Sequence, residues 1–80
     1  MFEQPEIIPL AKLRAGEKGQ IVFTGNHGAG FLQHLYDMGI NEGSEIEVIT
    51  SGRPGPFLVR VANTSLAIGH GIARKIMVEQ

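Results

Sequence analysis

The stretch FLQHLYDMGINEGSEIEV, residues 31–48, decides the fold class of this 80-residue chain because its hydrophobic period changes in the middle. Apolar residues first recur at the spacing of one helix face, at Phe31, Leu35 and Met38. Gly39 follows the last of them, at the position where a left-handed residue ends many helices. Apolar and polar residues then alternate from Ser44 to Thr50, as in a strand with one buried face. The stretch therefore predicts a two-turn helix that leads into a half-buried β-strand.

Four further segments have the β-branched and aromatic composition of short strands: 20–24, 57–62, 66–68 and 75–79. The resulting fold class is mainly β, a small five-stranded barrel with one short helix between the first two strands. A closed barrel is expected because closure removes strand edges that a chain of this length has no other means to cover. Residues 1–8 are predicted to be a loose N-terminal lead-in and residues 9–80 a single domain. Shorter features are a tight turn at Asn63-Thr64 and one helical turn within 69–74.

The composition excludes several classes of protein. Apolar residues make up 42% of the chain and charged residues 19%, which is typical of a globular domain. The chain has no cysteine, so disulfides, thiolate zinc sites and iron–sulfur clusters are excluded, and a reducing, cytoplasmic location is expected. No apolar run approaches the ~20 residues that cross a bilayer, so we expect no direct membrane insertion. The net charge of −1 makes nucleic acid an unexpected partner.

Two local patterns resemble chemical sites but are incomplete. Gly25 and Gly30 have the glycine spacing of a phosphate-binding loop, yet Phe31 and Leu32 stand where that motif needs a lysine and a hydroxyl. His34 and Asp37 are three residues apart on the polar helix face and could meet. Metal sites in proteins, however, usually require three or four converging ligands.

No catalytic set is recognisable in the chain. The serines lie outside any nucleophile-elbow motif, and the alternating Glu45 and Glu47 fit the solvent-facing side of a strand. We therefore expect a protein that is not an enzyme and that has no catalytic residue, no cofactor and no metal site.

Residues 31–48, with their short leucine-rich helix, Met-Gly-Ile turn and alternating strand, resemble the signature of ferrous iron transport protein A, FeoA. Residues 10–19, LAKLRAGEKG, are similar to that family's L-x-x-L-x-x-G-x-x-G opening, and residues 66–78 to its closing strand, helical turn and strand. The resemblance implies an SH3-like barrel and an accessory role in ferrous iron uptake. It also implies a protein-interaction module for FeoB, the membrane permease with a cytoplasmic GTP-binding domain. The alternative is an SH3-like regulatory or nucleic-acid-binding barrel unrelated to iron transport.

SH3-like barrels bind extended segments in a shallow groove between loops, which suggests where a partner would bind. The candidate partner-binding residues lie on the outer face of the helix, in the 51–57 loop and on the strand faces turned away from the core: Gln33, His34, Asp37, Ile49, Arg53, Phe57 and Leu58. For Ile49 and Leu58 the competing interpretation is that they cover the second side of the barrel or a symmetric self-contact.

Overall fold

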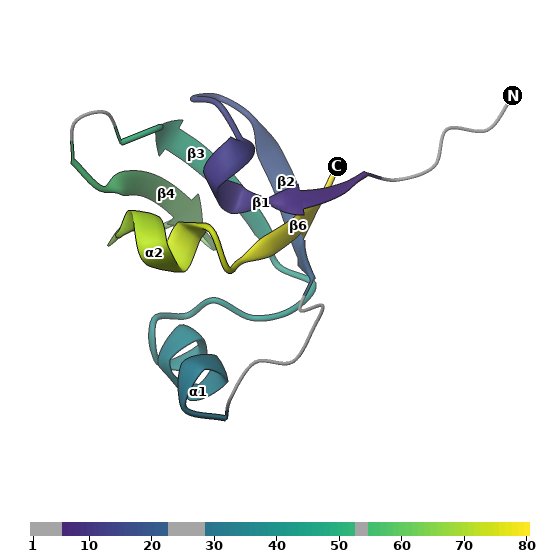
Figure 1. Cartoon of the computed structure of the whole chain (residues 1–80), viewed down its shortest axis with the longest axis vertical. Coiled ribbons are helices and arrows are strands. Elements are labelled where there is room, and N and C mark those ends of the chain that lie inside the picture. Colours follow the sequence, from purple (N-terminus) through teal and green to yellow (C-terminus); the bar gives the residue numbers. More distant parts are fainter. Residues whose placement is uncertain (1–5, 23–28, 53–54) are drawn as a thin grey trace, which may run out of the picture.

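The computed structural model describes residues 6–22, 29–52 and 55–80, and its centre is one antiparallel sheet (Figure 1). The strands are β1 (Ile7–Pro9), β2 (Lys18–Val22), β3 (Glu45–Thr50), β4 (Phe57–Val61), β5 (Thr64–Ile68) and β6 (Met77–Glu79). The helical elements are one 3-10 turn, η1 (Leu10–Lys12), the helix α1 (Ala29–Asp37) and the short helix α2 (His70–Ala73). Within the sheet the strands are ordered β1-β6-β2-β3-β4-β5, so strands from both ends of the chain meet on one side.

The hydrophobic core lies on the inner face of the sheet and follows the period-two pattern of the strands. Ile46 and Val48 of β3 are fully buried, and they pair with Val61 and Val59 of β4. The remaining core side chains come from nearly every element: Leu10, Leu13, Ile21, Leu35, Ile40, Phe57, Ile68, Ala73, Ile76 and Val78. The predicted inward orientation of Ile46 and Val48 is thus confirmed.

Helix α1 ends as the sequence predicts. Gly39 has a φ of +83°, and its N–H donates to the carbonyl of Tyr36 at 2.9 Å. The next N–H, of Ile40, donates to the carbonyl of Leu35 at 2.9 Å. This pair of hydrogen bonds is the Schellman arrangement, and its apolar contact is supplied by Leu35 and Ile40, which are both fully buried.

The strand count differs from the prediction. Six strands form the sheet, because Ile7–Pro9 pair with β6 and place part of the expected lead-in within the sheet. Pro9 is tolerated there because β1 is an edge strand, where a missing N–H leaves no ladder bond unmade. As a consequence α1 lies between the second and third strands, not between the first two.

The turn after β4 differs in position from the prediction, and the 3-10 turn η1 was not predicted. The tight turn after β4 is formed by Ala62 and Asn63, with φ of 49° and 68°, one residue earlier than predicted. Both residues are left-handed because a two-residue hairpin loop needs that twist. The helical turn expected within 69–74 is confirmed as α2, whereas the 3-10 turn η1 was not predicted. None of the helices in the described residues is long and apolar enough to cross a membrane.

Candidate functional site

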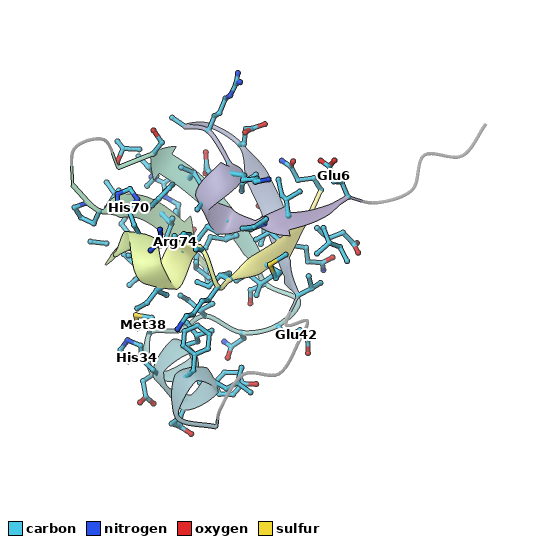
Figure 2. The ribbon with its side chains drawn as sticks, viewed as in Figure 1. Glu6, His34, Met38, Glu42, His70 and Arg74 are labelled. Atoms are coloured by element: carbon cyan, nitrogen blue, oxygen red, sulfur yellow. The ribbon has the colours of Figure 1, made fainter. Side chains whose placement is uncertain are left out.

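The helix part of the predicted partner-binding set is exposed. Gln33, His34 and Asp37 all lie on the solvent face of α1, and Figure 2 shows His34 at this helix. Asp37 Oδ1 accepts a hydrogen bond from Gln33 Nε2 at 2.9 Å. His34 and Asp37 are close enough in sequence to meet, but the hydrogen bond that the structure gives Asp37 comes from Gln33, one helical turn earlier.

The strand part of the set is half-buried. Ile49 lies where the register between β3 and β4 shifts, between Val48 and Thr50. Leu58 pairs with Thr50 on one side and Ala67 on the other. Neither Ile49 nor Leu58 is among the partly buried side chains that pack against the described core. They remain predicted contact residues.

The two remaining members of the set differ in kind. Phe57 is only 3% exposed and belongs to the core, so little of its ring is left for a partner. Arg53 lies outside the described residues, as do positions 25–28 of the loop that has the glycine spacing of a phosphate-binding loop.

The structure does not bring these candidates together on one surface. Helix α1 precedes β3 in the chain and is connected to its first residue, Glu45, whereas Ile49 is near the other end of that strand. At about 3.3 Å per residue the two ends of β3 are ~15 Å apart. Figure 1 shows α1 beyond the end of the sheet, away from the start of β4. The set therefore defines two separate surfaces.

A cleft that the sequence reasoning missed lies where η1 faces α2. Its volume is about 440 Å³, and its lining comes from both ends of the chain and from the segment after β3: Ala11, Lys12, Leu13, Arg14, Ser51, Phe57, His70 and Arg74. Figure 2 shows His70 and Arg74 on α2, at the side of the helix turned toward η1. The lining contains three cationic side chains and no carboxylate.

One wall of the cleft is fixed by His70. Its Nε2 lies 2.8 Å from the carbonyl oxygen of Gly52 and 2.9 Å from that of Gly55. Since both neighbours are acceptors, Nε2 carries the proton and donates to them. The imidazole also stands edge-on to the Phe57 ring, at 5.0 Å between centroids and 62° between planes. His70 thus ties α2 to the segment that joins β3 and β4.

The charged groups of the described residues form no metal centre. No three His, Cys, Asp or Glu side chains converge anywhere in ranges 6–22, 29–52 and 55–80. Of these groups, His70 is committed to two carbonyls and Asp37 to an amide. The ion pair between Arg60 Nη1 and Glu47 Oε1, at 3.7 Å, crosses β3 and β4 as an ordinary cross-strand pair.

Comparison with known proteins places the chain in a family. The FeoA domain model matches residues 8–80. A curated protein of Methanocaldococcus jannaschii, described as a candidate Fe(2+) transport protein A, is 44% identical over 71 residues, which are 89% of this chain and 84% of that protein.

Solved structures agree in fold. A crystal structure of an iron uptake regulatory protein, FeoA, superposes with a TM-score of 0.83 at 33% identity, over 94% of this chain and 100% of that one. The zinc complex of Stenotrophomonas maltophilia FeoA, described as an SH3 domain protein, superposes with a TM-score of 0.72 at 23% identity, over 89% and 88% of the two chains. The predicted mainly β, SH3-like fold is therefore confirmed, and with a family model that spans nearly all of its length, this chain belongs to the FeoA family.

Proposed function

We propose that this chain is an accessory protein of ferrous iron uptake that acts at the cytoplasmic side of the membrane by binding the permease FeoB. It performs no chemistry of its own in this role. The observation that carries the proposal is the family membership over residues 8–80, together with the 44% identity to a protein described as a candidate Fe(2+) transport protein A.

The described residues support a binding role over a catalytic one. Most of their titratable side chains are at the surface, and no polar or charged side chain of residues 6–22, 29–52 and 55–80 is buried. A general acid or base usually shows the opposite, a carboxyl or imidazole held in a water-excluding site. A binding module needs only an exposed surface, and the described part of the chain offers the polar face of α1, the outer face around Leu58, and the cleft between η1 and α2.

The alternative of a nucleic-acid-binding barrel has weaker support. Such domains gather Lys and Arg over a wide face to neutralise several phosphates. Among the described residues, three cations share the cleft, and Arg60 is instead paired with Glu47 across β3 and β4. This charge distribution favours recognition of a protein.

A pull-down tests the proposal. The affinity-tagged chain is incubated with detergent-solubilised FeoB from the same source, and in parallel with total RNA and fragmented DNA. Specific retention of FeoB, absent with an unrelated SH3-like barrel of similar charge, is the expected result. Retention of nucleic acid without FeoB would replace the proposed function by the alternative, and retention of neither would contradict both.

A further inference from the structure

We propose that the cleft between η1 and α2 binds an extended acidic segment of the protein partner, with Lys12, Arg14 and Arg74 as the groups that receive its carboxylates. This inference rests on the proposed function, because it states the chemistry by which the permease would be recognised. It assigns a role to residues that the sequence reasoning did not select.

The three cations form no ion pair within the described part of the fold. None of Lys12, Arg14 and Arg74 forms an ion pair with a carboxylate of the described residues. The salt bridge found among those residues joins Arg60 and Glu47. Lys75, which follows Arg74, does have a partner: its Nζ lies 5.4 Å from the centroid of the Phe31 ring. Three unpaired cations around one hollow repel one another, which an anionic ligand relieves.

The walls and floor of the cleft suit a peptide. Leu13 and Phe57, at 2% and 3% exposure, belong to the core and close the bottom of the hollow while offering little surface to a ligand. The volume of about 440 Å³ lies within the range of pockets that hold a drug-sized ligand. The groups left to contact a bound chain are the cationic side chains of the lining, and Arg clusters are a recurring means of recognising acidic motifs.

Bare phosphate is a poorer match for the same lining. Phosphate sites in loops use clusters of free backbone N–H groups. In this cleft the N–H of Leu13 donates to the Leu10 carbonyl at 3.0 Å, and the N–H of Arg14 donates to Glu17 Oε1 at 2.6 Å. The N–H of Arg74 donates to the His70 carbonyl at 3.0 Å. With these donors used internally, long side chains remain as the groups that meet an anion.

Charge is segregated over the molecule, which favours an acidic partner in one orientation. Glu17 is a carboxylate next to the cleft, where its Oε1 accepts from the N–H of Arg14, but it is not part of the lining. Glu45 and Glu79 line a hollow at β2 and β6 together with Lys18, and Glu45 and Glu47 line another at the β4–β5 turn together with Arg60. In Figure 2 Glu6 and Glu42 lie on the other side of the ribbon from His70. The cleft, whose lining has three cations and no carboxylate, therefore attracts an acidic segment more strongly than those two hollows do.

The experiment has a binding arm and a mapping arm. The binding arm measures the affinity of detergent-solubilised FeoB for the wild-type chain, for Lys12→Gln, Arg14→Gln and Arg74→Gln, and for the triple variant. Lys18→Gln is the matched control, since it removes one exposed cation that lines a different hollow, next to Gly19 and Gln20. Circular dichroism melting confirms that each variant is folded. The mapping arm probes the wild-type chain with overlapping short peptides that tile the cytoplasmic part of FeoB.

Each single cleft variant is expected to bind about 2–5-fold more weakly, the range of exposed ion pairs, and the triple variant about tenfold or more. Lys18→Gln should bind like wild type. The retained peptides should be rich in Asp and Glu, and replacement of those residues by Asn and Gln should release them. Raising the ionic strength well above 0.15 M should also weaken binding to the wild type, because the Debye length falls below ~8 Å.

The outcomes separate this inference from the proposed function. If FeoB binds the wild type and the triple variant equally, the cleft assignment is wrong while the proposed function stands. If FeoB binds neither but inorganic phosphate shifts the amide resonances of the cleft, the site is an anion site and the peptide assignment is overturned. If FeoB does not bind the wild type and no peptide is retained, both fail together.

Discussion

The segment that joins β3 to β4 contains a position where a single methyl group should be strongly destabilising. Gly52 has a φ of +72°, and a Cβ built on it would lie 2.7 Å from the Gly55 carbonyl oxygen, 2.7 Å from the Pro56 carbonyl carbon and 2.8 Å from the Phe57 nitrogen. All three neighbours are backbone atoms, which have no rotamer by which to move away. The same segment is tied to α2 by His70, so it has little freedom to relax.

The loss of stability caused by Gly52→Ala has two contributions. A left-handed backbone costs an alanine about 1–2 kcal/mol relative to glycine. Forcing a methyl group into filled space adds about 1–3 kcal/mol. Gly52→Ala should therefore lower the free energy of unfolding by about 2–5 kcal/mol. For a domain of this length that is a fall in Tm of about 8–40 °C, at about 4–8 °C per kcal/mol.

Two other glycines serve as matched controls for the same substitution. Gly39 has a φ of +83° but no atom within 4 Å of its Cβ position, so Gly39→Ala should cost only the backbone contribution of about 1–2 kcal/mol. Gly30 in α1 is exposed and has neither a left-handed φ nor a near neighbour, so Gly30→Ala should stabilise the domain by about 0.4–1 kcal/mol.

Chemical denaturation and differential scanning calorimetry of the three variants measure this series. From the highest Tm to the lowest, the expected order is Gly30→Ala, wild type, Gly39→Ala and Gly52→Ala. If Gly52→Ala melts at or above Gly39→Ala, then the close approach at Gly52 does not exist in solution, and the cleft wall built by that segment must be reconsidered.

Three further predictions follow from the same structure. Gly39→Val should lower Tm more than Gly39→Asn, since Asn tolerates a left-handed backbone and a β-branched residue does not, and equal melting of the two would contradict the Schellman ending. Anaerobic calorimetry with Fe(II) or Zn(II) should show no stoichiometric sub-micromolar site; such a site, lost in a His34→Ala/Asp37→Ala double variant, would overturn that expectation. Leu58→Glu should weaken pull-down of FeoB while leaving the circular dichroism spectrum unchanged, since Leu58 is half-buried outside the core cluster; full retention by the folded variant would remove the outer face of β4 from the binding surface.

Those parts of the fold whose causes are local could be predicted from the sequence. The Schellman ending at Gly39 depends on a few neighbouring residues, and so does the alternation in β3. The strand β1 was missed because three residues that include Pro9 have no periodic signal, and the strand exists only through its pairing with β6 at the other end of the chain. The turn was misplaced by one residue because Ala62 is a poor left-handed residue by itself, and the hairpin register imposes that conformation.

The candidate site was only partly predictable, for a related reason. Solvent-facing residues such as His34 and Asp37 could be identified from the helical period alone. Phe57 was expected among the partner-binding residues at the end of the 51–57 loop, whereas in the structure it is 3% exposed and belongs to the core. Composition could not decide this, because burial depends on which elements cover the strand end.

The cleft shows why a net charge of −1 says little about a binding surface. Lys12 and Arg14 come from the start of the chain and Arg74 from near its end. They meet because β1 pairs with β6, and the N–H of Leu10 donates to the Ile76 carbonyl at 2.7 Å, which places η1 against α2. The same topology places Glu45, Glu47 and Glu79 at two other hollows. A chain with nearly balanced charge can therefore present a cationic hollow to one partner, and this concentration of charge depends on the order of the strands and not on the composition.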